Sequence, residues 1–279
     1  MDVIEAAARN ALAEDEAWDD ATSLAVVGDG LHGTGAFVAR QPGVAAGFPV
    51  AAAAFRLIDP RIQFEQLVSE GAMFPAGAVL AEVRGPARGM LQAERIALNF
   101  VQRLCATATM TRAFVDAVTG TGAVILDTRK TTPGMRELEK YAVRCGGGVN
   151  HRATLGTMAM IKDNHREALA RAGHSLGDGV RMIRERTPGV PVEVEVDGLG
   201  ELEAALDGEP EWILLDNMSP ADMAEAVRRT GGRAKLEASG GINLETVLAA
   251  AKSGVDAVSV GAVTHSAGAL DISLDLRLD

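Results

Sequence analysis

The chain has 279 residues and a formal net charge of −11, and 47% of its residues are hydrophobic and 23% charged. This composition is typical of a globular protein, and the acidic charge argues against sequence-independent binding to nucleic acid or an anionic membrane, which needs an extended basic surface. The two cysteines, Cys105 and Cys145, form no CxxC motif, so neither a disulfide framework nor a zinc knuckle is indicated.

The first predicted element is an amphipathic helix over residues 1–18. Its apolar side chains recur at helical spacing, at Val3, Ile4, Ala7, Ala8, Ala11 and Leu12. This acidic N-terminus lacks the basic-then-apolar order of a signal peptide, and no uncharged apolar stretch reaches the roughly 18 residues of a membrane span. We therefore expect a cytoplasmic protein that does not bind membranes.

Residues 33–88 read as an α+β region. Strands are predicted over 33–40 and 78–85, where apolar runs end in Gly or Arg, and a helix is predicted over 51–59. Residues 90–119 contain no Gly or Pro and keep helical periodicity, so they form one long helix or two joined helices. We place the domain boundary here, with a first domain over 1–110 and a second over 111–266.

The second half repeats an apolar strand, a polar tip and a helix. Strands are predicted over 123–127, 158–162, 190–196, 212–216, 234–240 and 257–261. Helices follow four of them, over 176–186, 200–208, 220–232 and 243–254. This order predicts parallel βα units, and the absence of a GxGxxG after the first strand and of a P-loop favours a barrel over a nucleotide-binding wound sheet. Because fewer than eight strands are found, we expect an open, incomplete barrel.

The predicted strands end in polar or glycine residues, which matters because a parallel βα barrel builds its active site at the carboxyl ends of its strands. The tips are, in strand order, Arg129-Lys130, Lys162, Glu195, Asp216, Ser239-Gly240-Gly241 and Gly261. Two of these six tips are cationic, two are carboxylates and two contain glycine. We do not expect this distribution of residue types by chance, so we predict a ligand site at the carboxyl ends of the strands.

Residues 128–166 carry eight Lys or Arg against three acids, whereas the remaining residues hold 19 basic and 35 acidic side chains. A local positive field in an acidic protein suits a small polyanion in a cleft. We assign the helically spaced charges to a solvated helix face: Arg136, Glu137, Glu139, Lys140 and Arg144. The other cations are candidate ligands for carboxylate or phosphate groups, together with a histidine: Arg129, Lys130, His151, Arg152 and Lys162.

Two carboxylates and two glycine turns complete the predicted site. Glu193 and Glu195 lie two apart on one strand, so they face the same side, into the barrel. Glu195 together with Asp216 suits Mg²⁺ or ribose hydroxyls, and Glu193 suits a structural pairing with Lys162 or Lys235. The turns in ASGGI and SVGA resemble the phosphate cup of barrel enzymes. The residues thus indicate a ligand with phosphate, metal-bound and carboxylate groups without naming it.

Several long blocks resemble the quinolinate phosphoribosyltransferase family, also called carboxylating nicotinate-nucleotide pyrophosphorylases. They are LDTRKTTPGMRELEKYAVRCGGGVNHR, IKDNH, VEVEVD, LLDNMSP, LEASGGI and SVGAVTHS, with GVAAG and ERIALNFVQRLCATAT in the N-terminal part. The resemblance implies an N-terminal α/β sandwich domain, an open barrel, and a tail over 267–279 that returns to the first domain. It also implies a homodimer, or a higher oligomer, with sites shared between subunits. One departure is Asp19, where the family usually has Gly before Asp-x-Thr.

The implied reaction is a step of de novo NAD biosynthesis. With Mg²⁺, quinolinate and 5-phosphoribosyl-1-pyrophosphate would give nicotinate mononucleotide, pyrophosphate and carbon dioxide. The resemblance implies that the quinolinate carboxylates are bound by Arg129, His151, Arg152 and Lys162, with Arg95 from a neighbouring subunit. Lys130 would face the pyrophosphate and phosphate side, and Glu195 and Asp216 would contact ribose and Mg²⁺, directly or through water or substrate. A phosphate would be held by Ser239, Gly240, Gly261 and His265. Catalytic roles fall to Lys130, Lys162, Glu195 and Asp216.

Three other functions fit parts of the pattern. A relative from molybdenum-uptake loci shares the barrel, but Lys162 with Asn150-His151-Arg152 favours the quinolinate enzyme. Nicotinate phosphoribosyltransferase handles a single carboxylate and has less use for so many cations. A non-catalytic binder of a phosphorylated dicarboxylate would be repelled by Glu195 and Asp216.

Overall fold

The computed structural model describes residues 3–279, which form two compact units. The first contains the chain up to Arg112, residues 131–147 and the tail from Val263; the second contains residues 113–130 and 148–262. Segment 131–147, which we expected in the second domain, belongs to the first unit because its helix buries Leu138 and Ala142 in that unit's core. Residues 1 and 2 of the predicted helix over 1–18 lie outside the described residues.

The first unit contains a four-stranded antiparallel sheet in the order β12-β1-β5-β3. Its elements are α1 (Val3–Glu14), a 3₁₀ turn (Ala17–Asp19), α2 (Ala21–Val26), β1 (His32–Ala39), β2 (Gly43–Val44), α3 (Phe48–Ile58), β3 (Gln63–Gln66), β4 (Met73–Phe74), β5 (Val79–Pro86), α4 (Ala87–Ala117), α5 (Arg136–Cys145), α11 (Ala262–His265) and β12 (Ile272–Leu278). The C-terminal tail returns to this unit, where β12 pairs with β1. Asp20 caps α2 by accepting the Thr22 and Ser23 amides.

Helices α3 and α4 supply the apolar side chains that cover the sheet of the first unit. Phe37 on β1 meets Phe48 and Phe55 of α3 edge to face, with ring centroids 6.5 and 6.2 Å apart. Met90 and Val101 of α4 belong to the same buried cluster. The region expected to hold one or two helices over 90–119 is thus a single helix, held by its apolar face.

The second unit is a six-stranded parallel sheet in the order β6-β11-β10-β9-β8-β7. Its elements are β6 (Val124–Leu126), β7 (Ala159–Ile161), α6 (Asp163–Arg171), α7 (Leu176–Arg186), β8 (Val192–Val196), α8 (Leu202–Leu206), β9 (Trp212–Asp216), α9 (Pro220–Thr230), β10 (Lys235–Ser239), α10 (Val247–Lys252) and β11 (Ala257–Ser259). All six predicted strands are present at the expected places. Within residues 3–279, the end strands β6 and β7 do not pair with each other.

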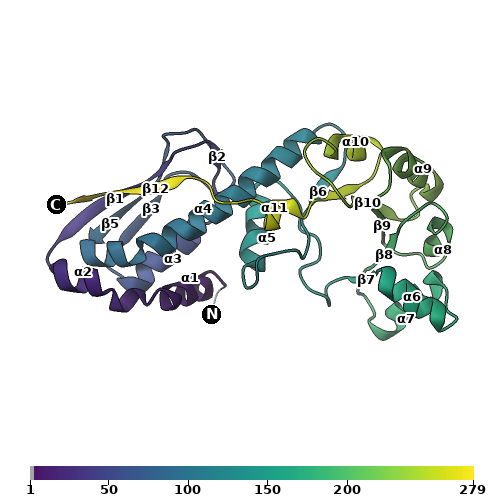
Figure 1. Cartoon of the computed structure of the whole chain (residues 1–279), viewed down its shortest axis with the longest axis horizontal. Helices are drawn as coiled ribbons and strands as arrows, with labels where there is room; N and C mark the ends of the chain where they lie inside the picture. Colours follow the sequence, from purple (N-terminus) through teal and green to yellow (C-terminus); the bar gives the residue numbers. More distant parts are fainter. Residues whose placement is uncertain (1–2) are drawn as a thin grey trace. The chain divides into compact units, whose positions relative to one another are not determined.

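This sheet curves, and helices α8, α9 and α10 lie on its outer side (Figure 1). Alternate residues of β8 explain the arrangement: Val192, Val194 and Val196 are fully buried under the helices, whereas Glu193 and Glu195 point to the inner side. The expected α/β class, with an N-terminal sheet domain and an incomplete parallel βα barrel, is confirmed.

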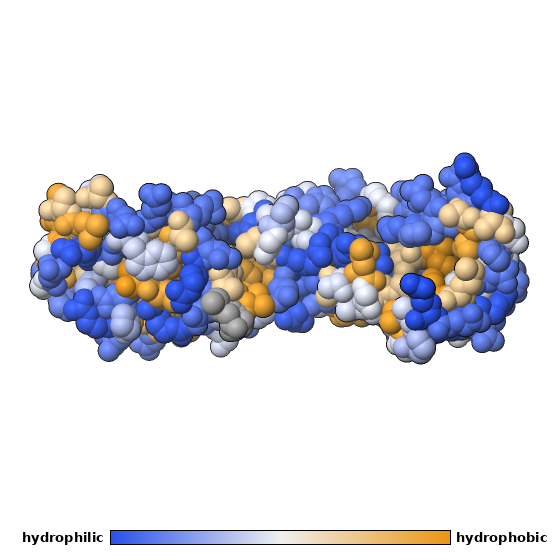
Figure 2. Space-filling model, turned by 90° about the horizontal axis from the view of Figure 1, so that it is seen from below, coloured by the Kyte–Doolittle hydropathy of each residue, from blue (hydrophilic) through white to orange (hydrophobic). Residues whose placement is uncertain are grey.

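The face shown in Figure 2 is mostly hydrophilic, and apolar residues appear on it in separate patches. Large apolar side chains that are exposed elsewhere along the chain, such as Val26, Met73 and Leu155, are scattered over different segments. Single exposed apolar residues are common on protein surfaces. None of the helices within residues 3–279 combines the length and apolar character needed to cross a membrane.

Candidate active site

A cavity of about 530 Å³ lies at the carboxyl ends of the strands of the second unit. It is lined by Thr128, Arg129, Lys130, His151, Arg152, Met160, Lys162, Asp163, Glu195, Leu214, Asp216, Glu237, Ser239 and Ser259. This volume is within the range that holds small-molecule ligands. The structure therefore brings eight of the twelve predicted site residues to one cavity: Arg129, Lys130, His151, Arg152, Lys162, Glu195, Asp216 and Ser239.

Two guanidinium groups, Arg129 and Arg152, lie on the wall of this cavity and form no ion pair with a carboxylate of the described chain. Arg129 Nε is buried and donates no hydrogen bond within residues 3–279. Arg152 donates to the Met158 carbonyl oxygen at 3.0 Å and approaches the Met160 sulfur at 3.5 Å, both neutral acceptors. Burial and the charge of Arg129 lower the pKa of Arg152, an effect that Glu193 only partly opposes. Such a cation pair is a site for an anion.

The two lysines of the site differ in their surroundings. Lys162 is half-exposed, and its Nζ lies 3.7 Å from Glu195 Oε2. It directly precedes α6, and its amide donates to His165 Nδ1, which fixes the backbone at the start of that helix. Lys130 is exposed on the loop after β6, and its amide is held by Thr128 Oγ1 at 3.0 Å.

Carboxylates gather at the ends of β8 and β9. Oxygens of Glu195, Asp197 and Asp216 lie within 4.8 Å of one another. Burial, and then the charges of Asp216 and Asp163, raise the pKa of Glu195, although Lys162 acts in the other direction. Three carboxylates held this close repel one another and suit a hard cation such as Mg²⁺. Asp197 was not predicted as part of this group, and it also pairs with Arg166.

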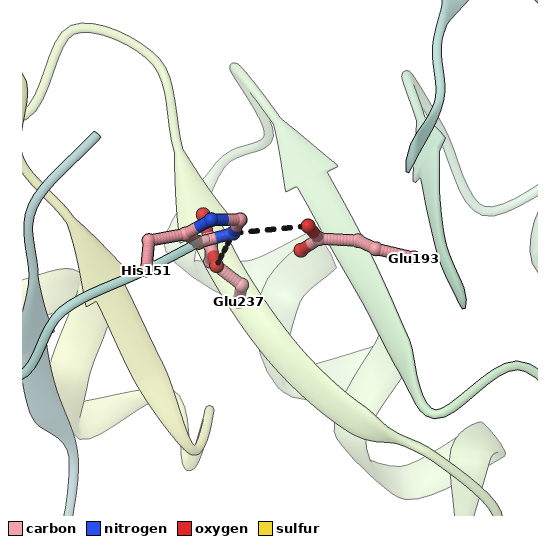
Figure 3. Close-up of side chains that lie close together, drawn as sticks. All are labelled: His151, Glu193 and Glu237. Carbon is pink, nitrogen blue, oxygen red and sulfur yellow. Dashed lines mark hydrogen bonds and ion pairs between the residues drawn. The ribbon is translucent and has the colours of Figure 1, made fainter. Parts of the chain in front are cut away.

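His151 lies deeper, between two buried carboxylates on the inner side of the sheet. Its Nε2 is 3.0 Å from Glu193 Oε2 on β8 and 3.2 Å from Glu237 Oε2 on β10, as Figure 3 shows. The expected pairing of Glu193 with Lys162 or Lys235 is wrong, because Lys162 lies near Glu195 and Lys235 lies over the ring of Trp212.

The proton balance of this cluster is set by burial and hydrogen bonding. Burial disfavours the charged ring, but hydrogen bonds to Glu193 and Glu237 outweigh burial and raise the pKa of His151 to about 9. Burial and the charge of Glu237 also raise the pKa of Glu193. The Arg152 amide points at His151 Nδ1 from 2.7 Å, so a proton on Nδ1 would face another donor. Since Nδ1 faces a donor, the ring proton lies on Nε2, where it faces both carboxylates.

The remaining predicted residues lie outside the cavity lining. Gly240 directly follows β10, and Gly261 lies two residues after the end of β11, at the same edge of the sheet. Gly240 has φ +90°, and a Cβ there would lie 2.2 Å from Asn217 Oδ1, so no other residue fits without movement. Arg95 is exposed on α4, and His265 is exposed on α11 with its Nδ1 2.7 Å from Ser266 Oγ. Both belong to the first unit.

Sequence reasoning missed the buried residues that support the site. Asp127, fully buried after β6, accepts the Asn150 side-chain amide at 2.6 Å and the His151 backbone amide at 2.8 Å. Glu237 was also missed, although its position two residues before Ser239 placed it on the inner face. The solvated face assigned to α5 is wrong for two residues, because Glu139 and Lys140 are buried.

Glu139 organises the start of α5 in the first unit. It accepts hydrogen bonds from the Thr132 amide and hydroxyl at 3.0 and 2.7 Å. It also pairs with Arg103 at 3.0 Å. A buried carboxylate with three donors is satisfied, which explains why a charge at helical spacing here is not at the surface.

The models of two domains match almost the whole chain. "Quinolinate phosphoribosyl transferase, N-terminal domain" matches residues 20–105, and "Quinolinate phosphoribosyl transferase, C-terminal domain" matches residues 107–275. The chain belongs to the quinolinate phosphoribosyltransferase family. The expectation drawn from the strand-tip motifs is therefore confirmed.

Members of this family match over nearly their full length. The chain is 48% identical to "Nicotinate-nucleotide pyrophosphorylase [carboxylating]" of Mycobacterium leprae, over 96% of this chain and 95% of that relative. It is 40% identical to a probable enzyme of the same name from Bacillus subtilis, over 95% and 90%. A solved nicotinate-nucleotide pyrophosphorylase structure from Francisella tularensis superposes with a TM-score of 0.92 at 37% identity, covering 99% of this chain and 96% of that one.

Proposed function

We propose that this chain transfers a phosphoribosyl group from 5-phosphoribosyl-1-pyrophosphate to quinolinate, releasing pyrophosphate and carbon dioxide and giving nicotinate mononucleotide. The observation that carries the proposal is the pair formed by Arg129 and Arg152, two guanidinium groups on one cavity wall without carboxylate partners in the described chain. A planar dicarboxylate matches two such forks. The names of the full-length relatives support the same reaction and favour it over the molybdenum-locus relative.

The carboxylates at the ends of β8 and β9 suit the sugar donor. When pyrophosphate leaves, positive charge develops on the ribosyl carbon, and the carboxylates of Glu195 and Asp216 stabilise that charge. Glu195, Asp197 and Asp216 would hold Mg²⁺, and a bound Mg²⁺ supplies charge neutralisation for the leaving pyrophosphate. Lys162, next to Glu195, and Lys130, on the loop after β6, are proposed to bind the anionic groups and orient them.

The loss of carbon dioxide needs little from the protein. Once the ring nitrogen carries the ribosyl group it is cationic, so the electron pair left at the adjacent carbon when the C–C bond breaks is stabilised by that nitrogen. A proton from solvent water then adds to this carbon and gives the product. The residues of the cavity therefore bind and orient the substrates, and the two arginines are proposed to hold the carboxylates of quinolinate. Ser239, Gly240 and Gly261 are proposed phosphate contacts at the ends of β10 and β11.

The roles proposed for Arg95 and His265, and a homodimer with shared sites, rest on the family resemblance. A mixed dimer tests them: Arg95→Ala and Lys162→Ala chains, each inactive alone, should regain about a quarter of the wild-type rate when mixed at random, because half of the dimers carry one intact site. Mixing without any recovery contradicts the shared site.

The decisive assay follows carbon dioxide release from carboxyl-labelled quinolinate with the sugar donor and Mg²⁺. Nicotinate serves as the control substrate, and Arg181→Ala as the control variant, since Arg181 is exposed on α7 and pairs only with Asp178 and the Asp207 carbonyl among the described residues. We expect release with quinolinate and none with nicotinate. The absence of release with quinolinate would falsify the proposed function.

A further inference from the structure

The buried cluster of His151, Glu193 and Glu237 is the feature that the proposed reaction does not use directly. Glu193 is 0% exposed and Glu237 2%, and the ring of His151 reaches between them from the segment after Val149 (Figure 3). Two carboxylates buried this close to each other need a donor between them. The Nε2 hydrogen of His151 is that donor.

Both ring nitrogens of His151 are engaged by the protein itself. Nε2 faces the two carboxylates, and Nδ1 accepts the Arg152 amide at 2.7 Å. A neutral imidazole has one donor and one acceptor nitrogen, so no ring nitrogen remains for a substrate carboxylate. The same geometry argues against a metal ion at Nε2, because a metal-bound histidine donates from its other nitrogen and here that nitrogen faces a donor.

The arrangement has a consequence for the Arg152 guanidinium. Glu193 is close enough to affect the pKa of Arg152, yet Arg152 donates to the neutral Met158 carbonyl oxygen and approaches the Met160 sulfur. An arginine normally pairs with a nearby carboxylate, and a bidentate pair would occupy its fork. The ring of His151 occupies the Glu193 carboxylate instead, and Nε2 also lies 3.2 Å from Glu237.

We propose that His151, Glu193 and Glu237 are a positioning unit: the histidine keeps two buried carboxylates from capturing Arg152, so that its guanidinium fork stays open for a carboxylate of the substrate. The inference rests on the proposed function, since the substrate it concerns is quinolinate. It replaces direct binding by His151 with an indirect role, and it gives Glu193 and Glu237 a part in the same site.

A rescue experiment separates this role from direct contact. His151→Leu removes the donor, so Arg152 should turn to the carboxylates that are left without a hydrogen-bond donor. The KM for quinolinate should then rise roughly 30-fold or more, and the KM for the sugar donor should change less than about threefold. The triple variant His151→Leu/Glu193→Gln/Glu237→Gln removes the competing carboxylates as well. Its KM for quinolinate should return to within about tenfold of the wild-type value.

Each outcome decides the question. If the triple variant binds quinolinate as poorly as His151→Leu, or if His151→Leu binds normally, the positioning role is overturned. Should His151→Leu not fold, the triple variant is compared with wild type, and a loss above about 30-fold counts against the proposal. Should the triple variant not fold, His151→Gln decides with the same limit, because its amide still donates to the carboxylates. Carbon dioxide release by the wild-type protein is measured first, and a failure there refutes the proposed function rather than this inference.

Discussion

Replacing Arg152 by Ala tests the division of the cavity into a quinolinate side and a sugar-donor side. Loss of one partner of a hydrogen-bonded charge pair costs about 2–5 kcal/mol. The lower part of this range applies here, because removing Arg152 also removes its repulsion with Arg129, which contributes to the lowered pKa of Arg152. A loss of about 2–3 kcal/mol corresponds to a roughly 30- to 150-fold rise in the KM for quinolinate.

The assay is steady-state carbon dioxide release, with one substrate varied while the other is saturating. The KM for the sugar donor should change less than about threefold, since its proposed contacts lie on the carboxylate side. Arg152→Lys keeps the charge but not the fork and should fall between Ala and wild type. Arg181→Ala, which breaks an exposed pair on α7, should match wild type. Equal losses for both substrates would refute the assignment of Arg152.

Three further predictions concern stability and the metal. Asp127→Ala leaves the buried donors of Asn150 and His151 without their acceptor. The variant should therefore lower the unfolding free energy by about 2–5 kcal/mol and lower Tm in thermal denaturation by several degrees. An unchanged Tm contradicts the role of Asp127. Hydrogen bonds to Glu193 and Glu237 raise the pKa of His151 from 6.5 to about 9 on folding, so the cluster of these three residues binds a proton more tightly in the folded chain. This stabilisation is complete below pH 6.5 and is lost as the pH rises to about 9, so the unfolding free energy measured in urea should fall by up to about 3 kcal/mol over this window, and a flat profile contradicts the prediction. Glu195→Gln should raise the Mg²⁺ concentration that gives the half-maximal rate roughly tenfold or more. Asp197→Asn should raise this concentration less, because Asp197 also pairs with Arg166. Equal effects of the two variants would show that Asp197 is an equal ligand.

The strands and their polar tips were predictable because two local rules act together. A parallel strand buried on its outer face alternates apolar and inner residues, and the chain then turns at a polar or glycine residue, as at Asp216 and Gly240. The same alternation placed Glu193 and Glu195 on one face. Strands β7 to β11 lie in chain order, as βα connectivity predicts, and the number of units indicated an incomplete barrel. Connectivity did not predict the open edge, because β6 pairs with β11 and leaves β7, the next strand along the chain, at the other end of the sheet.

Partners across the sheet could not be predicted, since they depend on contacts between residues far apart in sequence. Glu193 has His151 as its partner, 42 residues away, rather than a lysine of the neighbouring strands. Glu139 is buried because Arg103 and the Thr132 amide satisfy it, which helical charge spacing alone does not reveal. Sequence reasoning therefore assigns a charged side chain on a helix to the surface, because it does not reveal the distant donor that would satisfy the charge in the core.

The two arginines of the cavity lining, Arg129 and Arg152, form no ion pair with a carboxylate of residues 3–279. Arg129 follows β6, whereas the carboxylates of Glu195 and Asp216 come from β8 and β9, which β11 and β10 separate from β6 in the sheet. Lys162 lies 3.7 Å from Glu195. A ligand with carboxylates at one end and a metal-bound diphosphate at the other would satisfy both sides at once.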